Sequence, residues 1–192
     1  MKEIILIGGG GHCKSVIDVI EQESKFNIIG IVDKSKYLGY SLLGYPYIGT
    51  DTDLPKLAKT YKYALITIGQ IKFSSTRINL YNLAINAGFI LPKIISPTAY
   101  VSNHSSVGNG TVVMHNAVVN ASTSIGDNCI INTSALVEHD CTISNHCHVS
   151  TNVTINGGVI IESGSFIGSS VTVKELIEIN KNSFIKAGSL LK

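Results

Sequence analysis

The chain has 192 residues, of which 44% are hydrophobic and 15% are charged, and its formal net charge at neutral pH is +2. This composition can bury a core and excludes a disordered chain. The small net charge comes without a cluster of basic residues, and the eight Tyr and five Phe show no stacking pattern beside Arg or Lys. The sequence therefore argues against a nucleic-acid partner.

The beginning of the sequence is a short apolar run, Ile4–Ile7, which breaks into glycines. It is too short for the core of a signal peptide, and no later segment has the length of a bilayer span. We therefore expect a cytoplasmic protein with no membrane partner, in which the four cysteines stay reduced.

Residues 1–93 alternate strand-like and helix-like segments. The predicted order is strand 2–7, helix 12–23, strand 27–32, strand 63–68 and helix 74–86. In the first helix the apolar residues Val16, Ile17, Val19 and Ile20 recur at helical spacing. Strand, glycine turn, helix and strand begin a doubly wound α/β unit. We expect residues 1–93 to form a small Rossmann-like domain that binds a nucleotide or sugar.

Four glycines, Gly8–Gly11, connect the first strand to the first helix. Glycines at this place allow backbone amides to approach a phosphate, and a helix N-terminus favours negative charge. Asp33 ends the second strand and is placed to bind a ribose hydroxyl or a base. The run does not complete the GxGxxG pattern, because Cys13 occupies the last glycine position. A tight strand–helix turn without a ligand remains the alternative.

From Ile95 onward the sequence follows a six-residue period. Every sixth position is Ile, Val or Leu, a run that chance would produce on the order of once in a million sequences of this hydrophobicity. The positions are Ile95, Val101, Val107, Val113, Val119, Ile125, Ile131, Val137, Ile143, Val149, Ile155, Ile161, Ile167, Val173, Ile179, Ile185 and Leu191.

A second series lies four residues after the first and consists almost entirely of small or β-branched residues. Its members are Ala99, Ser105, Thr111, Ala117, Thr123, Cys129, Ala135, Cys141, Cys147, Val153, Val159, Ser165, Val171, Ile177, Ser183 and Ser189. Six residues make a short strand and a corner, so three steps make a triangular coil whose interior holds both series. We therefore expect residues 94–192 to form a left-handed parallel β-helix of about five to six coils.

The positions of the cysteines in this repeat predict their role. Cys129, Cys141 and Cys147 all fall in the second series. We expect buried structural thiols, with Cys129 and Cys147 stacked on adjacent coils, rather than a metal or redox site.

One polar segment of the β-helix suggests chemistry. His139 is flanked by Glu138 and Asp140, and a carboxylate beside an imidazole fixes its tautomer and increases its basicity, as a general base requires. His148 lies half a coil later, so the two histidines face different sides of one prism. They could meet only if a neighbouring subunit supplied one of them, which points to an active site between the subunits of a threefold oligomer.

The histidine spacings do not predict a metal centre. The sequence has no HExxH or CxxC pattern, and the β-helix histidines do not form an evident set of three ligands. They are His104, His115, His139, His146 and His148. We expect no metal.

The sequence resembles the NeuD/PglD-type sugar acetyltransferases, which include sialic acid O-acetyltransferases and N-acetyltransferases of UDP-linked 4-amino sugars. The resemblance covers nearly the whole chain and is most specific in the glycine-rich start and in the Asn-Thr-Ser…Glu-His-Asp-Cys stretch. The matching segments are Gly8–Lys14, Ile31–Lys34, Ile68–Gly69, Ser75–Arg77, Ile131–Cys141, His148–Val153 and Asn156–Gly158.

The resemblance implies an enzyme that takes acetyl-CoA as co-substrate and assembles as a homotrimer, with CoA along the β-helix between subunits. It implies that His139 is the catalytic base, supported by Asp140, and that His148 and Gly157 bind acetyl-CoA. It implies that His12 and Lys14 belong to the loop that approaches the nucleotide or sugar. Together with Gly9, Gly10, Gly11 and Asp33, assigned above from the strand–helix turn, they are the predicted substrate-binding residues.

These inferences favour N-acetylation of a UDP-type amino sugar for surface glycan biosynthesis, by direct attack without an acyl-enzyme, because no outward cysteine is paired with a base. O-acetylation of sialic acid or a related nonulosonic acid remains open, since Ser150–Val153 also resembles that branch. The alternative outside the enzymes is a non-catalytic nucleotide-sensing β-helix module, which would keep the N-terminal site and lack CoA binding.

Overall fold

The computed structural model describes residues 1–71 and 73–192, which divide into two compact units. The first unit comprises residues 1–69 and 75–92. The second comprises residues 93–192 together with the described residues of the segment 70–74. That short segment therefore groups with the β-helix, although its neighbours in sequence on both sides belong to the first unit.

The first unit contains a five-stranded sheet in the order β3-β4-β2-β1-β5. The strands are β1 (Lys2–Ile7), β2 (Phe26–Val32), β3 (Ser41–Leu42), β4 (Tyr45–Gly49) and β5 (Tyr63–Ile66). β1 pairs in parallel with β2 and β5, and β2 pairs in parallel with β4. β3 is antiparallel to β4 and closes the edge as a hairpin.

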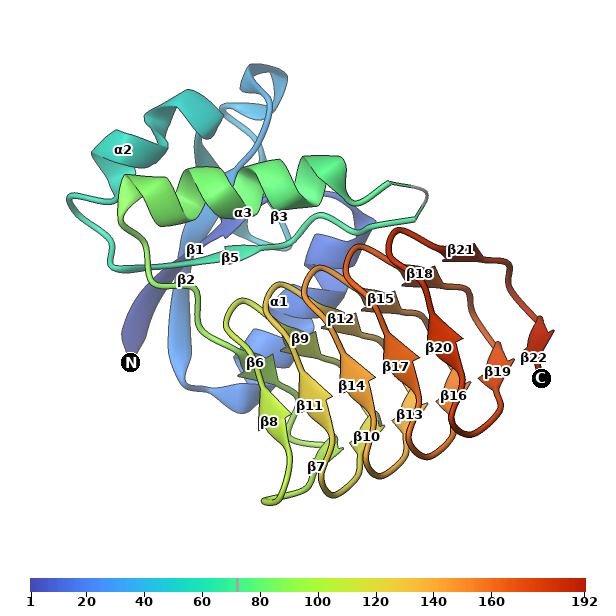
Figure 1. The fold of residues 1–192 in the computed structure, drawn as a ribbon. Coiled ribbons are helices and arrows are strands. Elements are labelled where there is room, and N and C mark those ends of the chain that lie inside the picture. Colours follow the sequence, from blue (N-terminus) through green and yellow to red (C-terminus); the bar gives the residue numbers. More distant parts are fainter. Residues whose placement is uncertain (72) are drawn as a thin grey trace. The chain divides into compact units, whose positions relative to one another are not determined.

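The helices of this unit are α1 (Gly11–Glu23), α2 (Leu54–Leu57) and α3 (Ser75–Ala87), with 3-10 turns at Ser35–Tyr37 and Asp51–Asp53. Alternate residues of β1, Ile5 and Ile7, share a core with Leu54 of α2 and with Leu80 and Ala84 of α3. The two helices therefore cover the same face of the sheet, as Figure 1 shows.

The predicted α/β class is confirmed, and the predicted strands and helices end within two residues of the observed ones. The sequence did not predict β3, β4 or α2. Gly44 and Pro46 interrupt the β3–β4 hairpin, and such residues are typical of loops. α2 is a single turn, too short to show a helical period.

The second unit is the predicted left-handed parallel β-helix, built from two-residue strands that stack coil upon coil (Figure 1). The strands are β6 (Ile94–Ile95), β7 (Tyr100–Val101), β8 (Ser106–Val107), β9 (Val112–Val113), β10 (Val118–Val119), β11 (Ser124–Ile125), β12 (Ile130–Ile131), β13 (Leu136–Val137), β14 (Thr142–Ile143), β15 (His148–Val149), β16 (Thr154–Ile155), β17 (Ile160–Ile161), β18 (Phe166–Ile167), β19 (Thr172–Val173), β20 (Glu178–Ile179), β21 (Phe184–Ile185) and β22 (Leu190–Leu191).

Three parallel sheets form the sides of this β-helix, with the orders β22-β19-β16-β13-β10-β7, β20-β17-β14-β11-β8 and β21-β18-β15-β12-β9-β6. Strands pair with the strand 18 residues away, as Val119 pairs with Val137 and Val137 with Ile155. Residues of both predicted series make up the interior core. The six-residue period therefore gave the fold of this unit correctly.

Many corners of the coils contain a residue with positive φ. The non-glycine residues in this conformation are Asn116, Ser122, Asn128, Ser134, Asp140, His146, Asn152, Ser170, Leu176 and Asn182. Asn and Asp tolerate this left-handed region better than other residues with a Cβ. The corners can therefore turn sharply enough to close a triangular coil.

The cysteines lie inside the fold, as the repeat predicted. Cys13, Cys129, Cys141 and Cys147 are free thiols and are buried. The Cys147 amide donates to the Cys129 sulfur of the adjacent coil at 3.4 Å. In the described part of the chain, no three His, Cys, Asp or Glu side chains are grouped to hold a metal. No described helix combines the length and hydrophobicity needed to cross a membrane.

Candidate active site

A hollow of about 540 Å³ lies at the corner between β13 and β14, and we call it the His139 hollow. The residues that line it come from three successive coils of the β-helix. They are Glu138, His139, Asp140, Asn156, Gly157, Gly158, Glu175 and Leu176. The sequence had assigned three of these residues, His139, Asp140 and Gly157, to the active site, and the structure brings them together.

His139 and Asp140 form a close pair at the mouth of the hollow. The distance from His139 Nδ1 to Asp140 Oδ2 is 2.7 Å, and the two side chains are 65% and 63% exposed. Because a carboxylate accepts but does not donate, Nδ1 carries the hydrogen and Nε2 is left with a lone pair. The pair therefore presents the imidazole in the form that can take a proton from a substrate.

Gly157 makes room for the imidazole. A Cβ at Gly157 would lie 2.7 Å from His139 Cε1 and 3.0 Å from Nε2, so any side chain there would displace the ring. The next residue, Gly158, has a φ of +69°, and its N–H donates to the His139 carbonyl at 3.0 Å. In the described part of the chain, the Gly157 N–H has no such acceptor and can bind an oxygen that develops negative charge.

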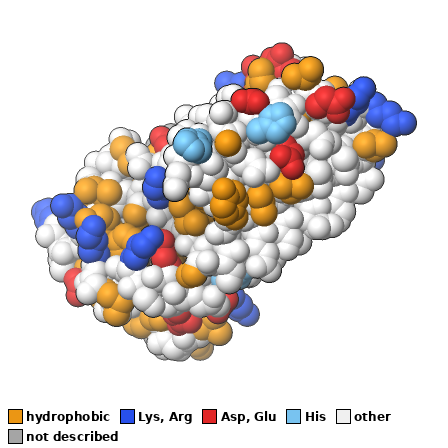
Figure 2. Space-filling model, turned by 90° about the horizontal axis from the view of Figure 1, so that it is seen from below, with side chains coloured by type: hydrophobic (Ala, Val, Ile, Leu, Met, Phe, Trp, Pro, Cys, Tyr) orange, Lys and Arg blue, Asp and Glu red, His pale blue; other side chains and the backbone are white. Residues whose placement is uncertain are grey.

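The hollow is acidic. Its carboxylates are Glu138, Asp140 and Glu175, and no Lys or Arg is among the described residues that line it. Asn120, one coil earlier, donates to Glu138 Oε2 at 2.7 Å and holds this carboxylate in place. Figure 2 shows a face of the molecule on which histidine and acidic side chains lie side by side.

The sequence did not assign Asn156, Glu175 or Leu176 to this site. The signal that could have found them is the 18-residue stacking, because Glu138 and Asn156 are one coil apart, as are Gly157 and Glu175. The strands follow this 18-residue spacing, as the pairing of Leu136 with Thr154 shows. Applied to the corners, the same spacing would have assigned Asn156, Glu175 and Leu176 to the site.

His148 lies on a different side of the β-helix from His139. It is part of β15, on the sheet with β12 and β18, and it is only 7% exposed. Its Nδ1 donates to the Gln70 carbonyl at 2.6 Å, so Nε2 accepts from Asn132 Nδ2 at 3.1 Å. Within one chain the structure therefore does not bring His148 to His139, and both of its nitrogens already have partners.

The N-terminal loop and Asp33 come together as the sequence suggested. Asp33 Oδ2 accepts the Gly9 N–H at 2.6 Å, and Oδ1 accepts the Lys34 N–H at 2.7 Å. Gly10 is the N-cap of α1, and Gly10 and Gly11 are exposed. Since Asp33 occupies the Gly9 amide, the amides from Gly11 onward at the start of α1 remain to meet an anion.

The other residues assigned to this loop lie at the start of α1. His12 is half-buried, and Lys14 is exposed on the first turn of the helix. Because Lys14 is exposed on this turn, its ammonium is accessible to a ligand phosphate.

Two tyrosines that the sequence missed lie beside the same loop. Tyr47 lies so close to Gly9 that a Cβ at Gly9 would collide with the tyrosine oxygen. The rings of Tyr37 and Tyr47 stack with centroids 5.3 Å apart, and the Lys36 ammonium lies 4.9 Å from the Tyr37 centroid. Tyr47 belongs to β4, which the sequence did not predict, so the contact between Tyr47 and Gly9 could not be predicted either.

Burial and the carboxylate of Asp33 both act on the titratable groups near the loop. Burial, and then the charge of Asp33, raise the pKa of Tyr47 and the pKa of Asp51 above their usual values. Burial raises the pKa of the Cys13 thiol to about 11, with a smaller contribution from Asp33. Tyr47, Asp51 and Cys13 therefore stay neutral to a higher pH than the same groups do in water.

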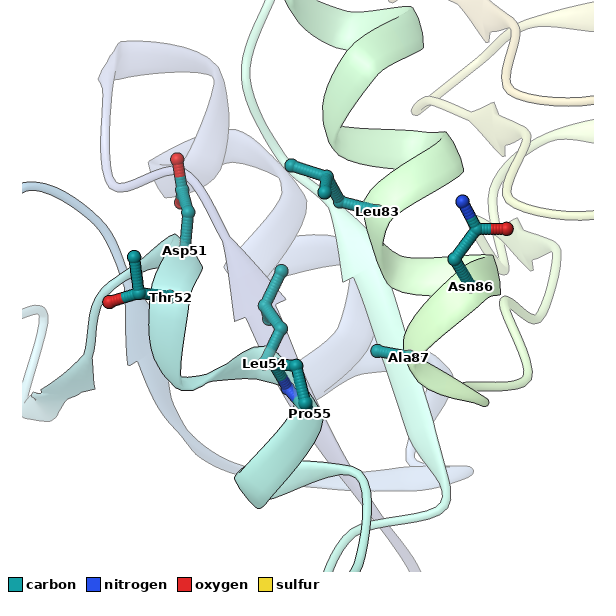
Figure 3. A pocket seen from close by; sticks show the side chains of 7 residues that line it. All are labelled: Asp51, Thr52, Leu54, Pro55, Leu83, Asn86 and Ala87. Atoms are coloured by element: carbon teal, nitrogen blue, oxygen red, sulfur yellow. The ribbon is translucent and has the colours of Figure 1, made fainter.

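A second hollow, of about 430 Å³, lies in the first unit between α2 and α3 (Figure 3). Its lining is Asp51, Thr52, Leu54, Pro55, Leu83, Asn86 and Ala87. None of the residues assigned to a site from the sequence lies there, and its surface is mostly apolar.

Comparison with known proteins finds a matching family and several similar structures. Residues 3–82 match the PglD N-terminal domain family. A histidine-to-asparagine variant of perosamine N-acetyltransferase from Caulobacter crescentus, solved with CoA and GDP-perosamine, is 32% identical, with a TM-score of 0.93 over 100% of this chain and 89% of that one.

The acetyltransferase domain of PglB from Neisseria gonorrhoeae FA1090, solved with acetyl coenzyme A, is 29% identical. Its TM-score is 0.91 over 99% of this chain and 92% of that one. No curated protein sequence matches the chain.

The α/β unit, the β-helix and these relatives together define the class: the protein is a sugar acetyltransferase of the hexapeptide-repeat type. The chain belongs to the NeuD/PglD-type family, as its resemblance to that family implied.

Proposed function

We propose that the protein transfers the acetyl group of acetyl-CoA to the amino group of a nucleotide-linked amino sugar, for surface glycan biosynthesis. The observation that carries this proposal is the His139–Asp140 pair, whose nitrogen and oxygen are 2.7 Å apart, at the glycine-lined corner of the β-helix. The relatives that match over nearly the whole chain were solved with CoA and GDP-perosamine, or with acetyl coenzyme A.

The transfer needs one base and one oxyanion donor. The amine lone pair attacks the thioester carbon, and His139 Nε2 takes the proton that the amine loses. The Gly157 N–H stabilises the negative charge that develops on the carbonyl oxygen. The C–S bond then breaks, and the protonated imidazole, held by Asp140, returns its proton to the leaving CoA thiolate.

The charge of the His139 hollow favours an amine acceptor. Glu138, Asp140 and Glu175 line it, and the ammonium of Lys174 lies 4.0 Å from Glu175. An amino sugar is attracted by Glu138 and Asp140 as an ammonium ion, and it loses one proton to solvent before its amine attacks the thioester. Sialic acid carries a carboxylate of its own, which the same groups repel. The O-acetylation alternative is therefore the weaker one.

The first unit supplies the site for the nucleotide. Gly9, Gly10, Gly11, His12 and Lys14 surround the start of α1, where backbone amides favour a phosphate. Asp33 lies at the end of β2, beside these amides, and is placed to accept a hydrogen bond from the ribose or the base.

We expect a homotrimer that acts in the cytoplasm. Tyr100 and Leu190, at the two ends of one side of the β-helix, are each 58% exposed, and Val118 and Leu136 between them are half-buried. Thr154 and Thr172 occupy the remaining outward positions of this sheet, so these positions carry no charge. An exposed face with several apolar side chains is typical of one that another subunit covers. A neighbouring subunit would also supply the second histidine that one chain does not bring to His139. Reduced thiols at all four cysteines fit the cytoplasm.

A thioester assay tests the proposal. The protein is mixed with acetyl-CoA and with UDP- and GDP-linked amino sugars, free sialic acid or CMP-sialic acid, and the release of CoA thiol is followed. We expect release only with nucleotide-linked amino sugars, with an amide-linked product seen by mass spectrometry. The matched control is the same nucleotide sugar with a hydroxyl in place of the amine. Faster release with that control or with sialic acid would contradict the proposed acceptor.

A further inference from the structure

Leu176 differs in type from the residues at equivalent corners of the β-helix. Its φ is 62°, in the left-handed region, where a side chain with a Cβ is disfavoured unless it is short and polar. Within residues 93–192, every other residue with positive φ is Gly, Asn, Ser, Asp or His. A leucine at this corner therefore has a backbone cost that its counterparts on other coils avoid or reduce.

Burial does not explain this leucine. Its side chain is 79% exposed, more than any other large apolar side chain of residues 93–192. An apolar side chain contributes to folding when it leaves water, and in the single chain this one stays in water. Neither the backbone conformation nor core packing accounts for Leu176, so its role lies in contact with something else.

The contacts of Leu176 direct it to the His139 hollow. Its N–H donates to the Gly157 carbonyl at 3.0 Å. Its Cδ2 lies over Gly158, where a Cβ would be only 2.6 Å away. The side chain therefore folds back toward the coil before it, and that coil stacks directly on the coil of His139.

Leu176 also has the only apolar side chain among the described residues that line the hollow. The others are polar or are glycines. A ligand with an apolar end, positioned for attack beside His139, can bury that end against Leu176 alone.

We propose that Leu176 is the apolar wall of the acyl-donor site, where it contacts the methyl of the acetyl group and limits the length of the acyl chain. This proposal rests on acetyl transfer at His139. The acetyl methyl gains by leaving water against Leu176, whereas a longer acyl chain has to displace the leucine from its place over Gly158.

The test compares acyl donors. Leu176→Asn keeps a residue type suited to positive φ and removes the apolar wall, and Leu176→Gly also removes the side chain. We expect both variants to raise the ratio of kcat/KM for propionyl-CoA to that for acetyl-CoA by about tenfold or more, as one methylene changes discrimination in an apolar pocket.

Ile160→Asn is the matched control, since Ile160 is 41% exposed on strand β17, which pairs with β20, and lies outside the hollow. Its ratio should not change.

Two results overturn the proposal. One is an unchanged donor ratio in both Leu176 variants. The other is an equal loss with every donor together with dissociation of the oligomer, which makes Leu176 a subunit contact. Calorimetric binding of acetyl-CoA and propionyl-CoA without acceptor gives a separate readout. If the wild-type protein acetylates no acceptor, the proposed function fails, while the binding preference of the variants still decides the role of Leu176.

Discussion

The two units position their polar side chains by different means. In the β-helix each corner recurs every 18 residues, so His139, Gly157 and Glu175 follow one another along a single edge. In the α/β unit the contacts of Gly9 depend on strand order, because Asp33 comes from the end of β2 and Tyr47 from β4. A repeat lets the sequence show which residues are neighbours, whereas a mixed sheet shows this only once it is folded.

This difference suggests a division of labour between the units. In the proposed function, the β-helix would carry the base and the amide that act on the thioester, and the α/β unit would carry the amides and the carboxylate that hold the nucleotide. Changes in the β-helix should therefore act on kcat, and changes at the glycine loop should act on KM for the nucleotide sugar.

The largest expected effect comes from His139→Ala. Removing the general base should lower kcat by about 10²–10⁴-fold, with little change in stability because the side chain is 65% exposed. The measurement is steady-state kinetics with acetyl-CoA and the best amino sugar, together with thermal unfolding.

His104→Ala is the matched control for this prediction. His104 is exposed at a corner of the same β-helix, and its amide bonds to Ser102. It should keep the kcat of the wild type. Near-normal turnover of the His139 variant, as an intact oligomer, would remove His139 from the mechanism.

A smaller and different effect is expected from Asp33→Ala. This change removes the acceptor of the Gly9 and Lys34 amides and a charged partner for the nucleotide. A hydrogen bond to a charged group is worth about 1.5–3 kcal/mol, so KM for the nucleotide sugar should rise roughly ten- to hundredfold, with KM for acetyl-CoA unchanged. Asp18→Ala, on the exposed side of α1, is the control. An equal rise in both KM values would show that the two units do not divide the substrates.

The sequence predicted the β-helix better than the α/β unit, for a physical reason. Burial of one aliphatic residue at every sixth position leaves a periodic trace, and Ile95 through Leu191 follow it without a gap. The sheet of the first unit includes β4, whose Pro46 resembles a loop residue. Its place beside β2 is fixed by tertiary pairing, which the local sequence does not encode.

The same contrast applies within the candidate site. The closeness of His139 and Asp140 follows from their adjacency in sequence, and Glu175 could have been added from the 18-residue stacking. The hydrogen bond from His148 to the Gln70 carbonyl could not have been predicted. Its partner Gln70 belongs to a short segment that the sequence assigned to the first domain and that groups with the β-helix.

The last expected effect is on stability rather than on catalysis, and it concerns the buried thiols, which also differ between the units. In the β-helix a hydrogen bond from Cys129 lowers the pKa of Cys147, whereas in the α/β unit burial raises the pKa of Cys13 to about 11. An unfolded thiol ionises near pH 8.5, so the stability that Cys13 contributes is complete below that pH and is lost as pH rises toward 11. The loss should approach about 3 kcal/mol, since one pKa unit corresponds to about 1.4 kcal/mol. Urea unfolding of the reduced protein at pH 8, 9, 10 and 11 measures this loss. Cys13→Ala is the reference, because all other groups titrate in both proteins.

The difference in free energy of unfolding between the wild type and Cys13→Ala should shrink as pH rises. A constant difference would mean that Cys13 ionises as easily in the folded chain as in the unfolded one.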